Sequence, residues 1–507
     1  MRTILTLMLM AAILLVGCSD GPAPGTDPVW FDDMLGAPDQ APTGWPDLAT
    51  CSPLPGAAGR GGDLVVALAE PVAPGHAPVP LNDAERVLFA ACYETLTRVT
   101  CTGRLAAGLA EAWEPRENGR RWRLRLRPDA VFWDGTPVTA EAVISAWARN
   151  FDITQQSGRP CPGLWIEPSG RGMVALSSHL LEIRLAEPQV DLPHLLAHPA
   201  MAVSARRAGW LWPVGSGPAR LAADTDLPLP DLVCRPNQHH PEAPTWRTLT
   251  VRVLPDADQR DLLGADVDLT VIHSRAAVDY YAQLPDVRRT ALPWSHKYVL
   301  LVPPTSQLTP ASAVRLAAAD VTVADGRNTE RLTFRRCRPG GCPQLHGPTV
   351  TVFTPPLDPD PARDMLQAHH LYHLAGDADA AALAARVAAR LLPDAQVRPL
   401  PQTDLARSLQ DQEGAATIVR LDACYPTPCL STAALLAHGP WLQAALPEDL
   451  NDPCEAARLL LNSGRALPLA DTRAYLVWRG PLAGLALAHD GTPLLATLAV
   501  AAAEATP

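Results

Sequence analysis

The chain has 507 residues, of which 47% are hydrophobic and 19% are charged, and its formal net charge is −11. The length is too great for one ordinary hydrophobic core, so we expect two or three domains, and the composition excludes a chain that is disordered throughout. The acidic balance excludes non-specific binding to nucleic acid, which requires a basic surface.

Residues 1–17 indicate a signal peptide. Arg2 precedes an apolar run from Ile4 to Val16, which has the length of a signal-peptide core and is too short to span a bilayer. The run ends in L-V-G-C, which resembles a bacterial lipobox. This resemblance implies cleavage before Cys18 and acylation of Cys18 by palmitate or a similar chain, so that the mature protein is anchored to a membrane on its periplasmic or extracellular face. The alternative is a plain signal peptide with a chance cysteine.

Residues 18–59 are predicted to form the lipid anchor and a flexible tether, because they are rich in Pro, Gly and Asp and have no sustained periodicity. The folded body follows. Residues 63–69 indicate a buried strand, and 83–98 have helical spacing. Residues 122–127 alternate Trp or Leu with Arg, which is typical of a half-buried strand.

The remaining elements follow in chain order. Thr139 is placed to cap a helix that runs through Trp147. Gly215 and Gly217 are expected to be tight-turn glycines. Further strands are expected at 181–185, 248–254, 267–272, 297–303, 349–353, 416–421 and 474–479, and helices at 360–374, 378–391 and 453–462. Strands and helices are mixed along the whole chain, which indicates an α/β protein.

Eleven cysteines are present, and setting Cys18 aside for lipid leaves ten, an even number for an exported chain. This favours disulfides over a metal site, since no C-x-x-C pair occurs. Short spacing predicts the pairs Cys92–Cys101, Cys337–Cys342 and Cys424–Cys429. Four cysteines stay unassigned: Cys51, Cys161, Cys234 and Cys454.

Several common enzyme motifs are missing from the sequence. Lys297 is the only lysine and follows His296, so there is no G-x-x-x-x-G-K phosphate-binding loop. The G-x-S-x-G nucleophile elbow, the H-E-x-x-H zinc motif and the G-x-G-x-x-G motif are missing too. These absences remove the common routes to catalysis, but they do not by themselves disprove an enzyme.

Five blocks occur in a fixed order: E-T-L-T at 94–97, G-L-A-E-A-W-E at 108–114, W-R-L-R-L-R at 122–127, V-F-W-D-G-T-P-V-T-A-E-A-V at 131–143 and P-V-G-S-G-P at 213–218. Together they resemble the extracellular solute-binding proteins of family 5, the oligopeptide-, dipeptide- and nickel-binding group of ABC importers. The resemblance is strongest over residues 60–300.

This resemblance implies a type II periplasmic-binding-protein fold of class α/β, with two main lobes, an extra domain and a hinge between the lobes. The implied boundaries are 60–80, 195–300 and 465–507 for lobe I, 81–194 for the extra domain, and 301–464 for a lobe II that looks reduced. A ligand enclosed between the lobes is expected to favour the closed state.

The resemblance also implies a function in which no bond is made or broken, so we expect a protein that is not an enzyme, needs no catalytic residues and carries no cofactor. A monomeric, lipid-anchored substrate-binding protein captures a peptide or similar small solute by hinge closure and delivers it to the permease subunits of an ABC importer. Two alternatives stay open. One is a non-transport envelope sensor or scaffold of the same fold, and the other is a nickel- or metallophore-binding protein.

Peptide-binding members of the family carry an Asp in a D-Y-x-x-P segment that pairs with the amino group of the ligand. The comparable stretch here is L-D-A-C-Y-P-T-P-C at 421–429, where Cys424 occupies the Asp position and Asp422 lies two residues earlier. Either Asp422 replaces the family Asp, with Tyr425 beside it, or the amine site is lost and the ligand is not a standard peptide.

Three more residues are candidates for ligand binding. Trp294 is a candidate for an aromatic cleft wall, and the run from His296 to Lys297 enters a strand that leads toward the hinge in relatives. Lys297 is placed to meet a ligand carboxylate. His369 and His373 lie four apart on the predicted helix, a spacing that can hold a transition metal, but no third ligand is evident. For each of these residues an ordinary structural or surface role is the alternative.

Overall fold

The computed structural model describes residues 51–54, 56, 59, 61–159, 172–185, 188–189, 191–222, 231–302, 334–335, 370–392, 395–411, 415–422, 434–443, 446–447, 459–460 and 465–501. Within these ranges, no helix combines the length and the apolar character that a membrane span requires.

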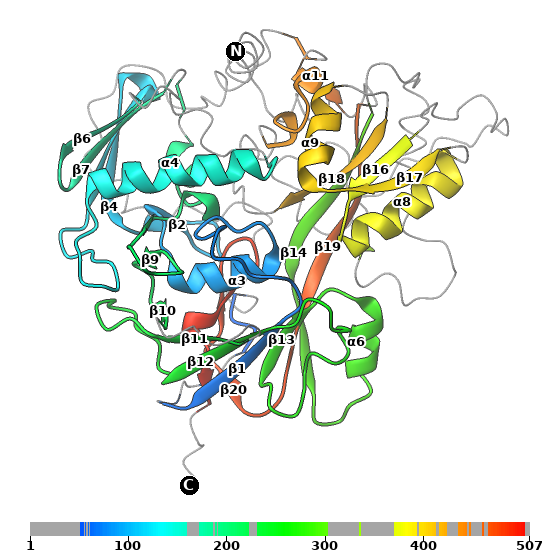
Figure 1. Ribbon diagram of the computed structural model, residues 1–507, viewed down its shortest axis with the longest axis horizontal. Helices are drawn as coiled ribbons and strands as arrows, with labels where there is room; N and C mark the ends of the chain where they lie inside the picture. The colour runs from blue at the N-terminus through cyan, green and yellow to red at the C-terminus, as the bar shows by residue number, and fades with distance from the viewer. Residues whose placement is uncertain are drawn as a thin grey trace.

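One sheet of eleven strands runs through the structure (Figure 1). Its order is β10–β11–β12–β1–β13–β19–β14–β18–β16–β17, and β15 pairs with β19. The strands are β1 Asp63–Leu68, β10 Ala219–Leu221, β11 Asp231–Pro236, β12 Thr248–Val253, β13 Leu269–Ile272, β14 Arg288–Leu301, β15 Phe334–Arg335, β16 His370–Leu374, β17 Gln396–Leu400, β18 Ala416–Asp422 and β19 Ala466–Trp478. Parallel pairs occur on both sides of the antiparallel pair β14–β19.

The described helices are α3 Asp83–Cys92, α4 Ala140–Gln156, α5 Leu192–Leu195, α6 Arg275–Tyr281, α8 Ala378–Leu391, α9 Gln402–Asp411 and α11 Pro440–Gln443, with 3-10 turns at Glu117–Gly119, Pro199–Met201 and Leu495–Thr497. The smaller sheets contain β2 Thr97–Val99, β3 Leu105–Ala107, β4 Ala110–Arg116, β5 Arg121–Leu126, β6 Met173–Ser177, β7 Leu180–Arg184, β8 Ser204–Ala205, β9 Val214–Gly215, β20 Leu482–Ala483, β21 Ala486–Leu487, β22 Pro493–Leu494 and β23 Ala499–Val500.

The long strands β14 and β19 cross from one half of the structure to the other (Figure 1). We call the first half the part built on β1, β10–β13, α3 and the sheet under α4, and the second half the part built on β16–β18, α8 and α9. Leu292 and Leu476 pack in the core of the first half, whereas Tyr298 and Leu469 pack in a separate core with α8. Two cores joined by a strand pair meet the structural requirement for hinge motion.

The crossing strands are irregular between the two cores. The register between β14 and β19 shifts twice between Ala291 and His296. Such β-bulges bend a strand and increase its local twist. The irregularity therefore lies where the chain passes from the first half to the second.

A four-stranded sheet in the order β4–β5–β7–β6 lies under α4 (Figure 1). The alternation at 122–127 is confirmed, because Trp122 and Leu124 are buried while Arg125 is exposed. The predicted cap is confirmed too, since the Thr139 hydroxyl accepts a hydrogen bond from the Ala142 N–H at 3.3 Å.

This sheet and the strands of the first half share one core, since Leu124 and Leu64 belong to the same hydrophobic cluster. The α3 helix, which lies inside the predicted extra domain, also packs in that cluster. The domain boundaries expected from the sequence stay predictions.

In the second half, α8 matches the predicted helix at 378–391. The prediction of a helix at 360–374 is wrong in its described part, because His370–Leu374 is the strand β16, paired with β17 and β18. Residues four apart on a strand are about 13 Å apart, since the rise is about 3.3 Å per residue. The proposed metal pair of His369 with His373 therefore loses the helical geometry that it required, and His369 itself lies outside the described residues.

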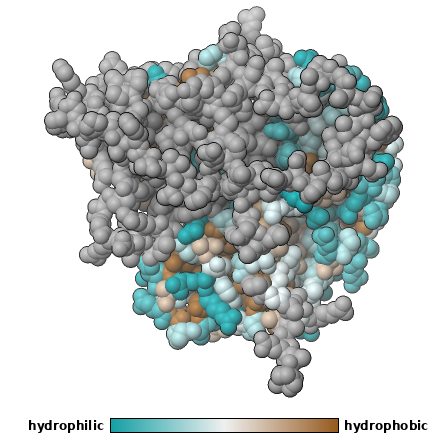
Figure 2. Space-filling view, turned by 180° about the vertical axis from the view of Figure 1, so that it is seen from behind, coloured by the Kyte–Doolittle hydropathy of each residue, from teal (hydrophilic) through white to brown (hydrophobic). Residues whose placement is uncertain are grey.

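The exposed large apolar residues come mostly from separate parts of the described chain. Figure 2 shows the face of the molecule opposite to that of Figure 1, and over its lower part hydrophilic and hydrophobic residues are interspersed. Among the described residues, the exposed large hydrophobic side chains are Leu176, Trp210, Leu211, Tyr280 and Val397. Apart from the neighbours Trp210 and Leu211 they come from separate elements, and scattered apolar residues are normal on a protein surface.

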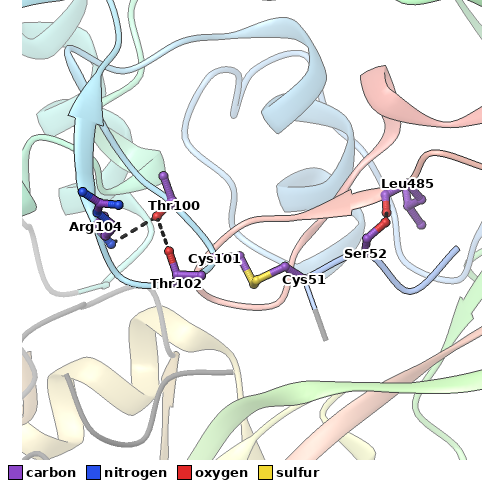
Figure 3. The surroundings of a disulfide bond; sticks show 7 residues. All are labelled: Cys51, Ser52, Thr100, Cys101, Thr102, Arg104 and Leu485. Carbon is purple, nitrogen blue, oxygen red and sulfur yellow. Dashed lines mark hydrogen bonds between the residues drawn. A yellow bond between two sulfur atoms is a disulfide. The ribbon is translucent and has the colours of Figure 1, made fainter. Parts of the chain in front are cut away.

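The predicted flexible tether is wrong for its last residues. Cys51 forms a disulfide with Cys101, and the Ser52 hydroxyl donates a hydrogen bond to the Leu485 carbonyl at 3.4 Å (Figure 3). The backbone of Leu54 accepts a hydrogen bond from Gly484, and its side chain is fully buried. The folded body therefore begins at or before Cys51, because covalent and backbone bonds fix this segment to the C-terminal hairpins.

The predicted disulfide Cys92–Cys101 is wrong. Cys101 is bonded to Cys51, while Cys92 is a buried free thiol in α3. A hydrogen bond to Cys234 of β11, together with burial, raises the pKa of the Cys92 thiol well above its ordinary value. Short sequence spacing suggested the wrong partner, because the fold places Cys92 next to Cys234 instead. The other two predicted pairs, Cys337–Cys342 and Cys424–Cys429, lie outside the described residues, as does Cys18.

Gly215 and Gly217 fulfil a packing requirement instead of the turn role expected for them. A Cβ atom added to Gly217 would lie 2.5 Å from the Cys92 carbonyl carbon, and one added to Gly215 would lie 2.1 Å from the Cys92 carbonyl oxygen. The Gly217 N–H donates a hydrogen bond to that oxygen at 3.0 Å. These glycines allow the backbone to approach the end of α3, which fixes the helix that carries Arg86.

We expect the substitution Gly217→Ala to lower the free energy of unfolding by about 1–3 kcal/mol, because the new methyl group meets backbone atoms that cannot yield without moving α3. Gly75→Ala is the matched control, since a Cβ there meets nothing within 4 Å. Urea denaturation of both variants measures the difference. Equal stability of the two variants would show that the backbone at Gly217 does not pack tightly against the end of α3.

We expect Cys51→Ser to lower the free energy of unfolding by about 2–4 kcal/mol, because the disulfide closes a loop in the unfolded chain. Cys51→Ser combined with Cys101→Ser should be no less stable than either single variant. Mass spectrometry of a non-reduced digest should recover a peptide pair joined through Cys51 and Cys101. A pair joined through Cys92 and Cys101 would contradict the structure.

Candidate ligand-binding site

A cavity of about 90 Å³ lies between the two halves. The first half contributes the loop before α3, Arg86 of α3, and the chain around the end of α4, while the second half contributes α9, β18 and the segment at 434–438. The lining residues are Val79, Pro80, Arg86, Thr154, Arg159, His198, Pro199, Ala200, Leu374, Gln402, Leu405, Leu409, Val419, Arg420, Leu421, Asp422, Ala434 and His438. Its walls therefore come from parts of the chain that lie far apart in sequence.

Asp422, the last residue of β18, lies among three arginines. Its carboxylate oxygens are 2.6 Å from Arg86 Nη2, 3.1 Å from Arg420 Nε and 3.6 Å from Arg159 Nη1. Burial by itself would raise the pKa of Asp422, but Arg420 and Arg86 hold that pKa well below its usual range. Asp422 is therefore a carboxylate at neutral pH whose charge is strongly compensated.

Arg86 connects the two halves. It lies in α3 of the first half and pairs with Asp422 of the second, 336 residues along the chain. The same guanidinium lies 3.7 Å from Asp83 and 3.7 Å from Asp490. Its side chain is only 7% exposed.

Arg420 lies two residues before Asp422 on β18, so both side chains lie on one face of the strand. It lies 3.6 Å from Asp83 and 4.0 Å from Asp377 in addition to its bond with Asp422. Burial would lower the pKa of Arg420, but Asp422 and Asp83 raise that pKa well above its usual value. Arg86 and Arg420 are thus each surrounded by several carboxylates.

His296 lies on β14 next to this network. Its Nε2 atom is 3.2 Å from Asp83 Oδ1 and 3.6 Å from Asp422 Oδ1. His273 Nε2 lies 3.6 Å from Asp83 Oδ2, so Asp83, His273 and His296 have three potential metal-ligating atoms within 4.8 Å of one another. The guanidinium groups of Arg86 and Arg420, each within 4 Å of the same Asp83 carboxylate, oppose a divalent cation there.

Two histidines in the cavity wall are neutral at pH 7. Burial, with Arg86 next, lowers the pKa of His198 to about 3. Burial, with Arg159 next, lowers the pKa of His438 to about 4. The three arginines therefore carry the positive charge of the cavity wall, and the histidines are polar groups without charge.

The structure brings together some of the predicted site residues. Asp422 lines the cavity and His296 lies behind it. Lys297 follows His296 on the same strand, where successive side chains point to opposite faces, and it is not part of the lining. His373 is buried, with Nδ1 within 3.0 Å of the Leu374 carbonyl oxygen.

Other predictions fall on parts of the chain that are not described. Tyr425 lies outside the described residues, and so does the Trp294 side chain, although its backbone belongs to β14. The residues that the sequence did not indicate are the three arginines and His438. The alternation of Arg420 with Asp422 on a predicted strand is the one signal that pointed to any of them. His198 repeats with His194 the spacing of four that can hold a metal, and the structure places it in the cavity wall.

We expect the protein to lose stability as the pH falls from about 6.5 toward 4, because unfolded histidines take up protons that buried His198 and His438 do not. Each such proton contributes a slope of up to about 1.4 kcal/mol per pH unit, with stability rising with pH. His438→Gln should reduce this slope, and His179→Gln in the β6–β7 turn is the control. Urea denaturation at several pH values between 4.5 and 7 measures the slope of the free energy of unfolding against pH for each variant. An unchanged slope in His438→Gln would contradict a buried neutral histidine.

Comparison with known proteins finds likeness both in sequence and in fold. Residues 104–290 match the family described as bacterial extracellular solute-binding proteins, family 5 middle. The chain is 32% identical to the periplasmic oligopeptide-binding protein OppA of Escherichia coli over 135 residues, which is 24% of each chain. It is 28% identical to the nickel-binding periplasmic protein of the same organism over 190 residues, which is 35% of each chain. These alignments thus span about a quarter to a third of the curated relatives.

The likeness in fold extends much further than the likeness in sequence. The crystal structure of NikA from Brucella suis in complex with Fe(III)-EDTA superposes with a TM-score of 0.64 at 19% identity, covering 86% of this chain and 99% of that one. The fold is therefore the α/β, type II periplasmic-binding-protein fold that the sequence predicted. Residues 104–290 therefore match the extracellular solute-binding proteins of family 5, and the described chain shares the fold of periplasmic binding proteins.

Proposed function

We propose that this protein is the substrate-binding component of an ABC importer, which captures a peptide or similar small solute between its two halves and delivers it to a membrane permease. The observation that carries the proposal is the cavity whose charged walls come from both halves. A ligand in such a position contacts both halves only when they are closed, so it binds the closed state more tightly and shifts the population toward it.

The crossing strands support this hinge mechanism. Two of the three register shifts in β14 fall between Ala291 and His296, where the strand leaves the first core, and the third follows Tyr298 in the second core. Such irregular strands can take up a bend between the halves. The cavity of about 90 Å³ is well below the roughly 300–1,000 Å³ typical of ligand pockets. It accommodates a small polar group, and a complete peptide requires the halves to separate.

The cellular setting is also part of the proposal. The lipobox at residues 15–18 supports an anchor on Cys18 that holds a monomer on the periplasmic or extracellular face of a membrane. The curated relatives are named as periplasmic binding proteins for oligopeptides and for nickel. The interaction with permease subunits follows from the proposed role.

A nickel- or metallophore-binding function is the second candidate, favoured by the proximity of Asp83, His273 and His296. Two guanidinium groups within 4 Å of Asp83 weigh against a bare dication at that position. A non-transport sensor of the same fold would use the same cavity, and only a partner permease distinguishes it from an importer component.

Thermal denaturation with a panel of ligands tests the proposal. We expect at least one ligand among di- to pentapeptides and small organic acids to raise the melting temperature, since a ligand that binds only the folded state stabilises it by about 2.7 kcal/mol at a hundred times its Kd. Nickel chloride and nickel with histidine form separate arms. Stabilisation by nickel alone, abolished by His273→Ala, would favour the second candidate. No response to any compound would contradict a solute-binding function.

A further inference from the structure

We propose that the cavity binds an anionic group of the solute, a carboxylate, and that Arg159 is its principal counter-charge. This inference rests on the proposed solute-binding function and narrows its substrate class. It also selects between the two interpretations that the sequence left open for Asp422. The three arginines around Asp422 disfavour the binding of a ligand ammonium group there, so the inference favours the loss of the amine site.

The charges of the cavity wall are the first observation. Among the described lining residues, Arg86, Arg159 and Arg420 are accompanied by a single carboxylate, that of Asp422, while Asp83, Asp377 and Asp490 lie outside the lining. A ligand atom in the cavity therefore meets guanidinium groups at shorter range than it meets most of the carboxylates that balance them. Coulomb energy falls with distance, so an anionic group is favoured in this cavity.

Among the described residues, Arg159 is the cavity arginine whose charge is least balanced. Arg86 and Arg420 each lie within 4 Å of three described carboxylates, whereas Arg159 lies within that distance of Asp422, at 3.6 Å. The side chain of Arg159 is also the most exposed of the three, at 21% against 7% and 13%. Its guanidinium is therefore the one best placed to bind a new anion.

Arg159 is also held in position. Its Nη2 atom donates a hydrogen bond to the Leu81 carbonyl in the loop before α3. A guanidinium oriented in this way loses little conformational entropy when a carboxylate binds, and its planar fork matches the geometry of the two carboxylate oxygens. The site is thus preorganised for an acid.

An ammonium group is disfavoured in the same place. It would need to approach Asp422, whose oxygens already lie within 3.6 Å of three guanidinium groups. A fourth cation at that range is repelled by all three guanidinium groups, and the carboxylates of Asp83, Asp377 and Asp490, which lie outside the lining, are farther from the cavity than Asp422 is. The position that would serve for amine recognition is therefore occupied by the protein's own arginines.

The neutral histidines complete the site for an acid. The Nδ1 atom of His198 accepts a hydrogen bond from the Ala200 N–H at 3.1 Å. In the neutral ring the proton is then on Nε2, which makes that atom a donor. Val79, Pro80, Leu405 and Val419 supply apolar wall beside these polar groups. The cavity suits a carboxylate carried on a small apolar group.

The test uses the purified full chain and dipeptides Ala-Xaa in three matched forms: N-acetylated with a free carboxylate, N-acetylated with an amide, and free amine with an amide. Succinate, citrate and inorganic phosphate are further arms. We expect the N-acetylated acids or the dicarboxylates to raise the melting temperature more than the matched amides do. Isothermal titration of the best acid gives its Kd, which should rise with ionic strength.

Variants at Arg159 then assign the counter-charge. We expect Arg159→Met to weaken the best acid at least tenfold, Arg159→Lys to weaken it less, and Arg125→Met to leave its Kd unchanged. Arg125 is an exposed arginine of β5 and serves as the matched control. If Arg159→Met proves unstable, the Kd of Arg159→Lys is compared with that of the wild type instead. Lysine keeps the positive charge but lacks the planar guanidinium fork, so the Kd should change only if the bound anion contacts this side chain.

The outcomes separate this inference from the proposed function. Binding of amides or free amines in preference to acids overturns the anionic site and leaves the solute-binding function in place. Binding of phosphate without any carboxylate overturns the assignment of the carboxylate. Acid binding that is equal in the wild type and in Arg159→Met overturns the role of Arg159. The absence of binding in every arm overturns the proposed function and this inference with it.

Discussion

The ion pair between Arg86 and Asp422 is the contact on which the site depends. It joins α3 of the first half to the end of β18 in the second, at 2.6 Å and almost without exposure to solvent. Burying two charges is costly unless each has further partners, and here Asp83 and Asp490 approach the arginine while Arg420 and Arg159 approach the carboxylate. The pair therefore exists as part of a network, and the network fixes the polarity of the cavity.

The position of this network follows from the construction of the sheet. β14 and β19 cross from one core to the other, and their register is irregular just before His296. Around His296 the sheet carries polar residues from both halves, because neither of the two hydrophobic cores includes the residues of this stretch. Hinge and charge cluster thus occupy the same place, so a group that enters the cavity acts directly on the contacts between the halves. This coupling is what a binding protein requires if ligand capture is to change its shape.

Parts of the fold and site were predictable because they rest on local chemistry. The Arg alternation at 122–127, the Thr139 cap and the helix at 378–391 depend on residues close in sequence, and all three are confirmed. Asp422 was indicated by a family motif, and His296 by its position at the entry to a strand that leads toward the hinge in relatives. No pattern in the neighbouring residues indicated Arg159, which follows the end of α4. Its role in the site depends on Asp422, which lies more than 250 residues away in the sequence.

By itself, the sequence determined the family resemblance, the α/β class and several of the longer strands, since hydrophobic periodicity and ordered motif blocks are properties of neighbouring residues. Only the tertiary structure decided which charges meet. It placed Cys101 against Cys51 and Cys92 beside Cys234, turned 370–374 into a strand, and packed three arginines around Asp422. Electrostatic and covalent partners are set by distance in space, which a linear pattern does not encode.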